Sequence, residues 1–289
     1  MYTLPLMALG GALAGMLGSM LGIGGGFIVV PMLTILFRVP MHLAVSSGQA
    51  AVMATSSMSA AYYVRERLSH IRLGILLETT STVGAIGGAL LGTRLDERWL
   101  AAIFGLAMMY MAWQMNRKKE GAGGTTVTAD DCRIVRLPVG MCSSFLAGVL
   151  SGLLGIGGGI VKVPVMCLVM GIPMKVATAT SVYTLGITAV AGATVYYSHG
   201  MTDLLVAGAI ALGVFCGALV GPRLAKRVRS QALRTGFAIV AVYTGYNMIV
   251  KALPLPKATQ VLLSLALAAG TVSVAAWRQR ATVAQQMKV

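Results

Sequence analysis

The sequence predicts an all-α polytopic membrane protein made of two inverted repeats. Each repeat holds a glycine-tipped re-entrant or short hairpin followed by three transmembrane helices. Three observations carry this prediction: the composition, a repeated glycine motif and the placement of basic residues. Of the 289 residues, 57% are hydrophobic and only 11% are charged, whereas soluble domains carry roughly 25% charged residues. A chain this apolar is an integral membrane protein.

The glycine motif divides the chain into two related halves. LGIGGGFIVVP at 21–31 returns as LGIGGGIVKVP at 154–164. At the same offset VPMHLAVSS (39–47) aligns with IPMKVATAT (172–180), and after a four-residue deletion GAIGGALLGTRL (84–95) aligns with GVFCGALVGPRL (213–224). Self-similarity of this kind marks an internal repeat. We therefore predict a first repeat at 1–116, a polar, glycine-rich linker at 117–136 and a second repeat at 137–289.

The apolar stretches define the elements of each repeat, because a transmembrane helix needs roughly 20 apolar residues. The predicted spans are 43–63, 72–92 and 99–115 in the first repeat, and 175–197, 203–221, 232–252 and 258–276 in the second. The stretches after the glycine clusters, 27–37 and 160–170, are too short. About eleven residues reach only about 16 Å, roughly half of the hydrocarbon core. We therefore predict hairpins at 3–37 and 137–170, and leave open whether their first arms span fully.

Basic residues set the orientation of the two repeats. The loop 65–72 holds three arginines, whereas 94–98 is balanced in charge. In the second repeat the bias is reversed, since 198–203 has no Lys or Arg and 223–234 has five. Basic loops face the cytoplasm, so equivalent loops face opposite sides and the repeats are inverted. This places the N-terminus outside the cell (inner) membrane and the linker and C-terminus in the cytoplasm. The net charge of +15 therefore reflects topology, and we expect no nucleic-acid partner.

The glycine clusters form candidate anion sites. Non-helical backbone persists at membrane depth only where it is buried in protein or lines a water-filled cavity. Glycine leaves its amide N–H accessible, and a helix start carries a partial positive charge. The candidate substrate-binding residues in the two turns are Gly24, Gly25, Gly26, Phe27, Gly157, Gly158, Gly159 and Ile160. The alternative is tight packing alone, which we also expect at Gly88, Gly92, Gly217 and Gly221.

Prolines follow both clusters and allow two local structures. Pro31 and Pro164 are either first-turn residues of very short helices, or they free the carbonyls of Phe27 and Ile160 inside a helix. A dinucleotide fingerprint is excluded, because Phe27 and Ile160 stand where it needs glycine. Inverted repeats that meet at broken helices are typical of secondary transporters.

GIGGGFIVVP and GIGGGIVKVP, repeated in a chain of this length, resemble the TauE/SafE family of sulfite exporters and organosulfonate permeases. The resemblance covers essentially the whole chain. It implies that the substrates are small sulfur-containing anions such as sulfite, thiosulfate and sulfonates. The two halves differ at one informative position, where Lys162 replaces the equivalent of Val29.

Lys162 is the first of the remaining candidates, because a charge deep in a membrane costs roughly 3 kcal/mol. We expect it to pair with the bound anion, so that Lys162→Met stabilises the empty protein and weakens binding. The alternatives are an ammonium that extends to the interface or one that faces a lumen. Glu78 is a candidate for proton coupling, with the alternative that it meets a basic loop residue near the cytoplasm.

Hydroxyl and amide side chains open the helices after the hairpins. The candidates there are Ser46, Ser47, Gln49, Thr180 and Ser181. They either bind substrate oxygens or bond back within their own helix. We expect no catalytic residue, metal site or cofactor; small anions and the lipid bilayer are the expected partners, and the oligomeric state is unknown. The favoured function is transport of a small anion by alternating access, with a passive channel or a membrane-embedded enzyme as alternatives.

Overall fold

The structure, a computed structural model, describes residues 3–21, 24–117, 137–225 and 230–253. Within these ranges the chain is helical and has no strand, which confirms the all-α class. The helices in chain order are α1 (Thr3–Leu21), α2 (Gly26–Pro31), the π-helix η1 (Met32–Leu36), α3 (Met41–Arg65), α4 (Ile71–Arg94), α5 (Glu97–Arg117), α6 (Leu137–Leu154), α7 (Gly159–Leu168), α8 (Met174–Ser198), α9 (Leu204–Ala225) and α10 (Ser230–Ala252). Nearly all of the predicted linker and the whole predicted span 258–276 lie outside the described residues.

Four of the described helices are long and apolar enough to cross a membrane. They are Ile71–Arg94, Leu137–Leu154, Val176–Ser198 and Leu204–Gly221. The chain is therefore a multi-pass membrane protein. Helix α3 is also long enough, with 25 residues, but it differs in character because it carries a row of buried polar side chains. They are Ser46, Ser47, Gln49, Thr55, Ser56 and Ser59.

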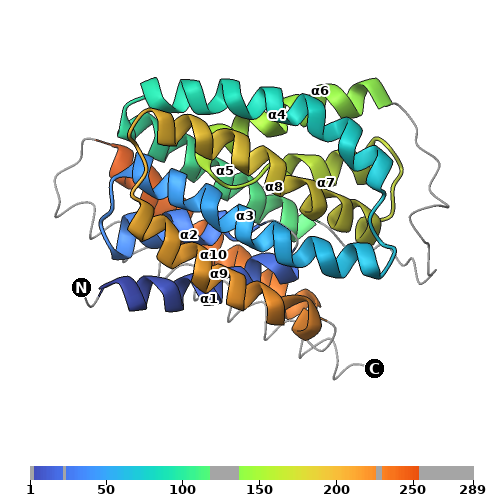
Figure 1. Cartoon of the computed structure of the whole chain (residues 1–289), viewed down its shortest axis with the longest axis horizontal. Coiled ribbons are helices and arrows are strands. Elements are labelled where there is room, and N and C mark those ends of the chain that lie inside the picture. Colours follow the sequence, from blue (N-terminus) through green and yellow to red (C-terminus); the bar gives the residue numbers. More distant parts are fainter. Residues whose placement is uncertain (1–2, 22–23, 118–136, 226–229, 254–289) are drawn as a thin grey trace, which may run out of the picture. The chain divides into compact units, whose positions relative to one another are not determined.

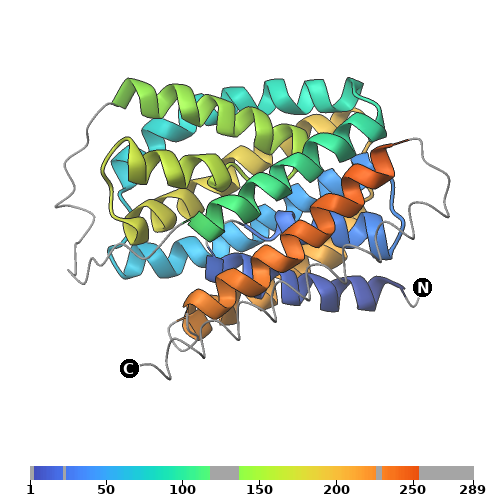
Figure 2. The same ribbon diagram turned by 180° about the vertical axis from the view of Figure 1, so that it is seen from behind.

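The packing divides the chain into two compact units that do not follow the two sequence halves. The first unit comprises Met1–Leu100 and Ala122–Val228, so it mixes helices of both halves. The second comprises Ala101–Gly121 and Arg229–Val289 and holds most of α5 together with α10. These two helices run side by side (Figure 2), with Gly105 of α5 against the carbonyl oxygen of Gly245 in α10. The candidate residues all lie in the first unit.

Both predicted hairpins are helix pairs. In the first, Gly10 of α1 lies against Met32, and Gly18 lies against the backbone of Gly24. In the second, Gly140 of α6 lies against Met170. The first arms hold 19 and 18 residues, or about 28 and 27 Å at 1.5 Å per residue. Of the two, α6 is one of the four candidate spans, whereas the apolar part of α1, Leu4–Met20, falls just short of that length. Both are longer than the return helices α2 and α7.

The first arm of each hairpin packs on a helix of the other half. In α4 and α6, Gly148 faces the carbonyl oxygen of Ser81, and Gly152 faces that of Ala85. In α1 and α9, Gly213 faces the backbone of Ala8 and Gly217 that of Ala12. Sequence numbers rise together across both contacts, so both pairs are parallel. A Cβ on Gly88, Gly92, Gly217 or Gly221 would lie within 2.3 Å of a neighbouring atom, which confirms their predicted role in close packing.

Helices α3 and α8 form an antiparallel pair between these two layers (Figure 1). Near the start of α3, the hydroxyls of Ser46 and Thr202 lie 2.6 Å apart. At the opposite end, the His70 amide donates to Thr180 Oγ1 at 2.9 Å. The first hairpin leads into the start of α3 and the second into the start of α8. The two hairpins therefore adjoin opposite ends of this central pair.

Both prolines lie inside helices, which selects the second of the two predicted local structures. Pro31 ends α2, and the chain continues directly as the π-helix η1. Pro164 lies within α7. Proline has no N–H to donate to the carbonyl four residues earlier, and a wider π-turn is a common response to such a break. Thr34 Oγ1 donates to the carbonyl oxygen of Val30 at 2.9 Å and so satisfies a group next to the break.

Candidate functional site

The two glycine turns adopt matching conformations at equivalent positions. Gly24 and Gly157 have φ values of 89° and 70°, a left-handed region that residues with a Cβ rarely occupy. Gly25 and Gly158 follow as the N-cap residues of α2 and α7, with φ near −70° in both. The local repeat in sequence therefore produces a local repeat in structure.

The two turns lie against one another. A Cβ on Gly26 would lie 2.2 Å from the carbonyl oxygen of Gly155 and 2.7 Å from that of Gly48 in α3. Gly155 in turn faces the carbonyl oxygen of Val45, and its φ is 68°. Only glycine permits three backbones to approach this closely. The turn of the first half therefore meets the turn of the second half beside α3.

The backbone amides of the two turns differ in their partners. The Gly25 amide donates to Thr55 Oγ1 at 3.1 Å. In the second turn, the Gly158 carbonyl accepts from the amides of Val161 and Lys162. Among the described residues, however, no hydrogen bond is donated by the amides of Gly158, Gly159 or Ile160. All three residues are buried. Buried amides are paired in most proteins, so these three donors are available to a ligand.

The predicted hydroxyl and amide candidates on α3 and α8 separate into two groups. Ser46 and Thr180 are used in contacts that join loops to helices, with Thr202 and the His70 amide respectively. Ser47 Oγ and Ser181 Oγ are buried and have no hydrogen-bond partner among the described residues. Gln49 lies between: its Nε2 donates to the Gly152 carbonyl at 3.1 Å, while its Oε1 has no such partner in that part of the chain.

Lys162 and Glu78 form a buried ion pair. Lys162 Nζ lies 2.6 Å from Glu78 Oε2, and the side chains are 1% and 4% exposed. The lysine therefore neither extends to an interface nor stands alone at depth. Glu78 does meet a basic residue, but that residue is a helical lysine of the other half and not a loop residue. Our expectation for its partner was wrong because the burial of Lys162 on α7 brings its ammonium to Glu78, the acidic residue that the described part of the chain places beside it on α4.

The second oxygen of Glu78 extends this pair into a network. Thr188 Oγ1 donates a short hydrogen bond to Glu78 Oε1, and Ser81 Oγ lies 3.2 Å from Thr188 Oγ1. Because Thr188 uses its proton on the carboxylate, Ser81 is the donor to Thr188. The carboxylate therefore accepts one hydrogen bond on each oxygen, whereas the Lys162 ammonium donates only one of its three within the described residues.

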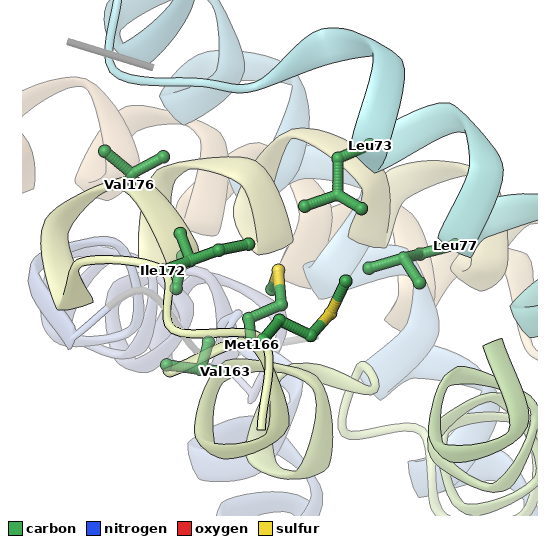
Figure 3. Packing of buried hydrophobic residues seen from close by; sticks show 8 residues of the cluster. Leu73, Leu77, Val163, Met166, Ile172 and Val176 are labelled. Carbon is green, nitrogen blue, oxygen red and sulfur yellow. The ribbon is translucent and has the colours of Figure 1, made fainter. Parts of the chain in front are cut away.

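An apolar cluster borders the ion pair on one side. Figure 3 shows Leu73 and Leu77 of α4 facing Met166 of α7, with Ile172 and Val176 beside them. Two members of this cluster are sequence neighbours of the pair: Leu77 comes directly before Glu78, and Val163 comes directly after Lys162. Few polar groups lie on that side of the pair, and a low-polarity setting strengthens the attraction between the two charges.

Sequence reasoning named most of these residues but missed Thr55, Thr188 and Ser81. The available signal was the repeat itself, because Thr55 and Thr188 occupy the same position of the two halves. The structure brings the two turns together beside α3, and it joins Lys162 to Glu78. Among the residues that the structure describes, no group of three His, Cys, Asp or Glu residues is placed to hold a metal ion.

The fold and the two apposed glycine turns define a multi-pass helical membrane protein, and comparison with known proteins places it among membrane transporters. The model of the sulfite exporter TauE/SafE family matches residues 7–248. The chain belongs to this family.

Relatives carry names of the same kind. The chain is 26% identical to the probable membrane transporter protein YunE of Bacillus subtilis, over 83% of this chain and 94% of YunE. It is 26% identical to the probable membrane transporter protein MJ0441 of Methanocaldococcus jannaschii, over 85% and 95% of the two chains. Sulfite exporter TauE/SafE family protein 5 of Arabidopsis thaliana is 33% identical over 35% of this chain and 22% of its own. No solved structure matches the chain.

Proposed function

We propose that this protein transports a small anion, a sulfur oxyanion or an organosulfonate, by alternating access around a site at the two glycine turns. The observation that carries the proposal is the set of unpartnered donors at the second turn. The amides of Gly158, Gly159 and Ile160 have no acceptor among the described residues. Consecutive amides at the start of a helix bind anions, and α7 has ten residues behind them.

Buried hydroxyls supply a second and independent argument. Ser47 and Ser181 each bury an Oγ without a partner in the described chain. Leaving such a group unpaired costs about 1–3 kcal/mol, so a function is the simplest reason to keep it. Ser47 precedes Gly48, whose backbone adjoins both turns. We assign the hydroxyls of Ser47 and Ser181 and the second N–H of Gln49 Nε2 to substrate oxygens, together with the backbone of Gly24, Gly26, Phe27 and Gly157 in the turns. Ser46 and Thr180 belong to the surrounding frame.

The pairing of helices supports inverted repeats. Exchanging the halves turns the α1–α9 contact into the α6–α4 contact and leaves α3–α8 unchanged. The hairpins adjoin opposite ends of the antiparallel α3–α8 pair. Two such halves that rock about a shared centre would expose the turns to each side in turn. We place the N-terminus outside the cell membrane and the loop after α3 in the cytoplasm, following the arginines of 65–72.

The chemical class of the substrate comes from the family. The matching family model is described as a sulfite exporter, and sulfite, thiosulfate and sulfonates share a compact group of negatively charged oxygens. Such a group fits several N–H and O–H donors that converge within a small space.

The test is a binding screen on purified protein. Thermal unfolding is measured with sulfite, thiosulfate, methanesulfonate and chloride, and we expect stabilisation by at least one sulfur anion and none by chloride. Gly158→Ala should abolish the stabilisation, because a Cβ there lies 3.0 Å from the Ala147 carbonyl oxygen and crowds the amides. Gly87→Ala is the matched control, since its Cβ would meet nothing within 4 Å. If the anion stabilises Gly158→Ala and Gly87→Ala equally, the turns have a purely structural role.

A passive anion channel is the alternative function. Uptake of a labelled anion into vesicles separates the two, because alternating access saturates with substrate and allows exchange against unlabelled anion on the other side. A flux that rises in proportion to concentration would favour the channel. A membrane-embedded enzyme is a weaker alternative, since the residues brought together are amides, hydroxyls and one ion pair without a nucleophile–base arrangement in the described chain.

A further inference from the structure

We propose that the Lys162–Glu78 pair couples the anion to a proton, with one proton bound on Glu78 for each anion bound at Lys162. This inference rests on the proposed function and adds its driving ion. In the empty protein Glu78 is the partner of Lys162. When an anion arrives, it replaces Glu78 on the ammonium, and the carboxylate takes up a proton.

The charge of the buried site is the physical reason. Lys162 and Glu78 are both almost fully buried, and together they are neutral. An anion added to this pair would place two negative charges against one ammonium, which is costly where water is excluded. A proton on Glu78 removes one negative charge, so the site loaded with a monovalent sulfonate is again neutral, and the site loaded with divalent thiosulfate carries one net negative charge instead of two. Anion and proton therefore bind together more readily than either binds alone.

The Lys162 ammonium has N–H groups that can bind the incoming anion. Lys162 donates one hydrogen bond, to Glu78 Oε2, and an ammonium has three protons to donate. Lys162 lies one turn after Gly158 on α7, and its amide bonds back to the Gly158 carbonyl. Side chains on a helix tilt toward its N-terminus. The side chain of Lys162 therefore leaves the helix in the direction of the end that carries the unpartnered amides.

Glu78 has a partner that suits both of its protonation states. Thr188 donates to Glu78 Oε1, and Ser81 stands behind Thr188 at 3.2 Å. Once Lys162 leaves Glu78 Oε2, that oxygen is free to carry the added proton while Oε1 keeps its hydrogen bond from Thr188. The network thus holds the carboxyl group in place before and after the exchange.

The repeat shows that the fold itself does not need this pair. At the equivalent positions stand Val29 in the first half and Ala207 in the second, and both are buried. Apolar residues therefore fill the equivalent positions. Replacing a buried ion pair by apolar residues is often neutral or stabilising, so the charges of Lys162 and Glu78 require a functional reason.

The ionisable groups around Glu78 are few. Among the described residues, Lys162 faces it from α7 and the hydroxyl of Thr188 from α8. The ring of Tyr183, also on α8, lies against Gly74, one turn before Glu78. Helix α6 brings no acidic or basic side chain to α4, because its sequence Leu137–Leu154 contains none. On α4 itself, His70 and Arg72 lie at the helix start, more than one turn before Glu78. Proton uptake on anion binding is therefore assigned to Glu78.

The test is isothermal titration calorimetry of the purified full chain with thiosulfate and methanesulfonate. These anions keep a constant charge between about pH 5 and 8, far above the acid range where they protonate. Titration in two buffers with different heats of ionisation gives the number of protons taken up per anion. We expect about one, with affinity rising about tenfold for each pH unit lowered while Glu78 is ionised in the free state, as proton linkage requires.

Glu78→Gln should bind the anion with no proton uptake and with an affinity independent of pH, because its neutral amide mimics the protonated carboxyl. Glu97→Gln is the control, since Glu97 is half exposed beside His42, and its proton uptake should equal that of wild type. Anion binding by wild type without proton uptake overturns the coupling and leaves the proposed function intact. Proton uptake that persists in Glu78→Gln also overturns it. If neither anion binds wild type, the substrate class and the coupling both fail. The wild-type titration tests the coupling of proton and anion even if a variant does not fold.

Discussion

Thr55 and Thr188 stand at the same position of the two sequence halves and serve different partners. Thr55 accepts from the Gly25 amide at 3.1 Å, whereas Thr188 donates to the carboxylate of Glu78. The difference follows from two positions at which the halves differ: Lys162 of the second half stands where the first has Val29, and Glu78 of the first half stands where the second has Ala207. The protein therefore has one turn whose cap amide is satisfied by the fold and one turn with amides left open. This asymmetry supports the proposal that the second turn supplies most of the amide donors to the anion.

Removing one member of the ion pair should destabilise the protein. From the sequence alone, Lys162→Met is expected to stabilise the empty protein. The structure reverses that expectation, because the change leaves Glu78 buried without its charged partner, at a cost of about 3–5 kcal/mol. The double variant Lys162→Met/Glu78→Gln should recover most of the loss. Thermal or denaturant unfolding in detergent of both single variants and the double variant measures it. Additive losses in the double variant would contradict the buried pair.

The α4–α6 contact should not tolerate a methyl group at its glycines. A Cβ on Gly84 would lie 2.3 Å from the Phe145 carbonyl oxygen, so Gly84→Ala must push the helices apart and should cost about 1–3 kcal/mol. Gly87→Ala lies on the same helix with nothing within 4 Å of its Cβ. It should be neutral or slightly stabilising, because alanine favours a helix over glycine by up to about 1 kcal/mol. Unfolding of the two variants is compared, and similar losses would argue against close packing there.

Replacing the two buried serines should lower anion affinity without lowering the stability of the empty protein. Ser47→Ala and Ser181→Ala remove hydroxyls without a partner in the described chain, so the empty protein should keep or gain stability. Anion affinity should fall, because a donor to the substrate is lost. Ser56 is the contrasting control: its Oγ donates to the Val182 carbonyl at 2.6 Å and accepts from the Gly186 amide. Ser56→Ala should therefore lose about 1–3 kcal/mol of stability. Unchanged anion affinity in both Ser47 and Ser181 variants would exclude them from the site.

Inverted repeats place equivalent loops on opposite sides of the membrane. Arg65 and Ser198 end the equivalent helices α3 and α8, and both side chains are exposed. We expect Ser198→Cys, in a background without the four native cysteines, to react with an impermeant maleimide in intact cells. Arg65→Cys should react only after the cells are opened, because its loop carries the basic residues that stay in the cytoplasm. Labelling of both from the same side is the result expected of parallel repeats.

Much of the architecture follows from the sequence alone. Composition determined that the chain is a helical membrane protein, since 57% hydrophobic residues exceed what a soluble surface accommodates. The glycine motif determined that each hairpin turns at Gly24 or Gly157, because a positive φ is a local property that glycine favours in any surroundings. Among the described residues, the helices from α3 onward begin and end near the limits of the apolar stretches, because the length of an apolar stretch is also a property of one segment.

Only the tertiary structure decided which charged and polar groups meet. Lys162 and Glu78 lie 84 residues apart and in different halves. The sequence around either residue does not predict that the other is its partner. Each was expected to find a separate partner, an anion for one and a loop residue for the other. The close parallel packing of α4 on α6 and the return of α7 bring them together. Burial then makes the pair obligatory, because an unpaired charge at that depth costs more than helix packing recovers.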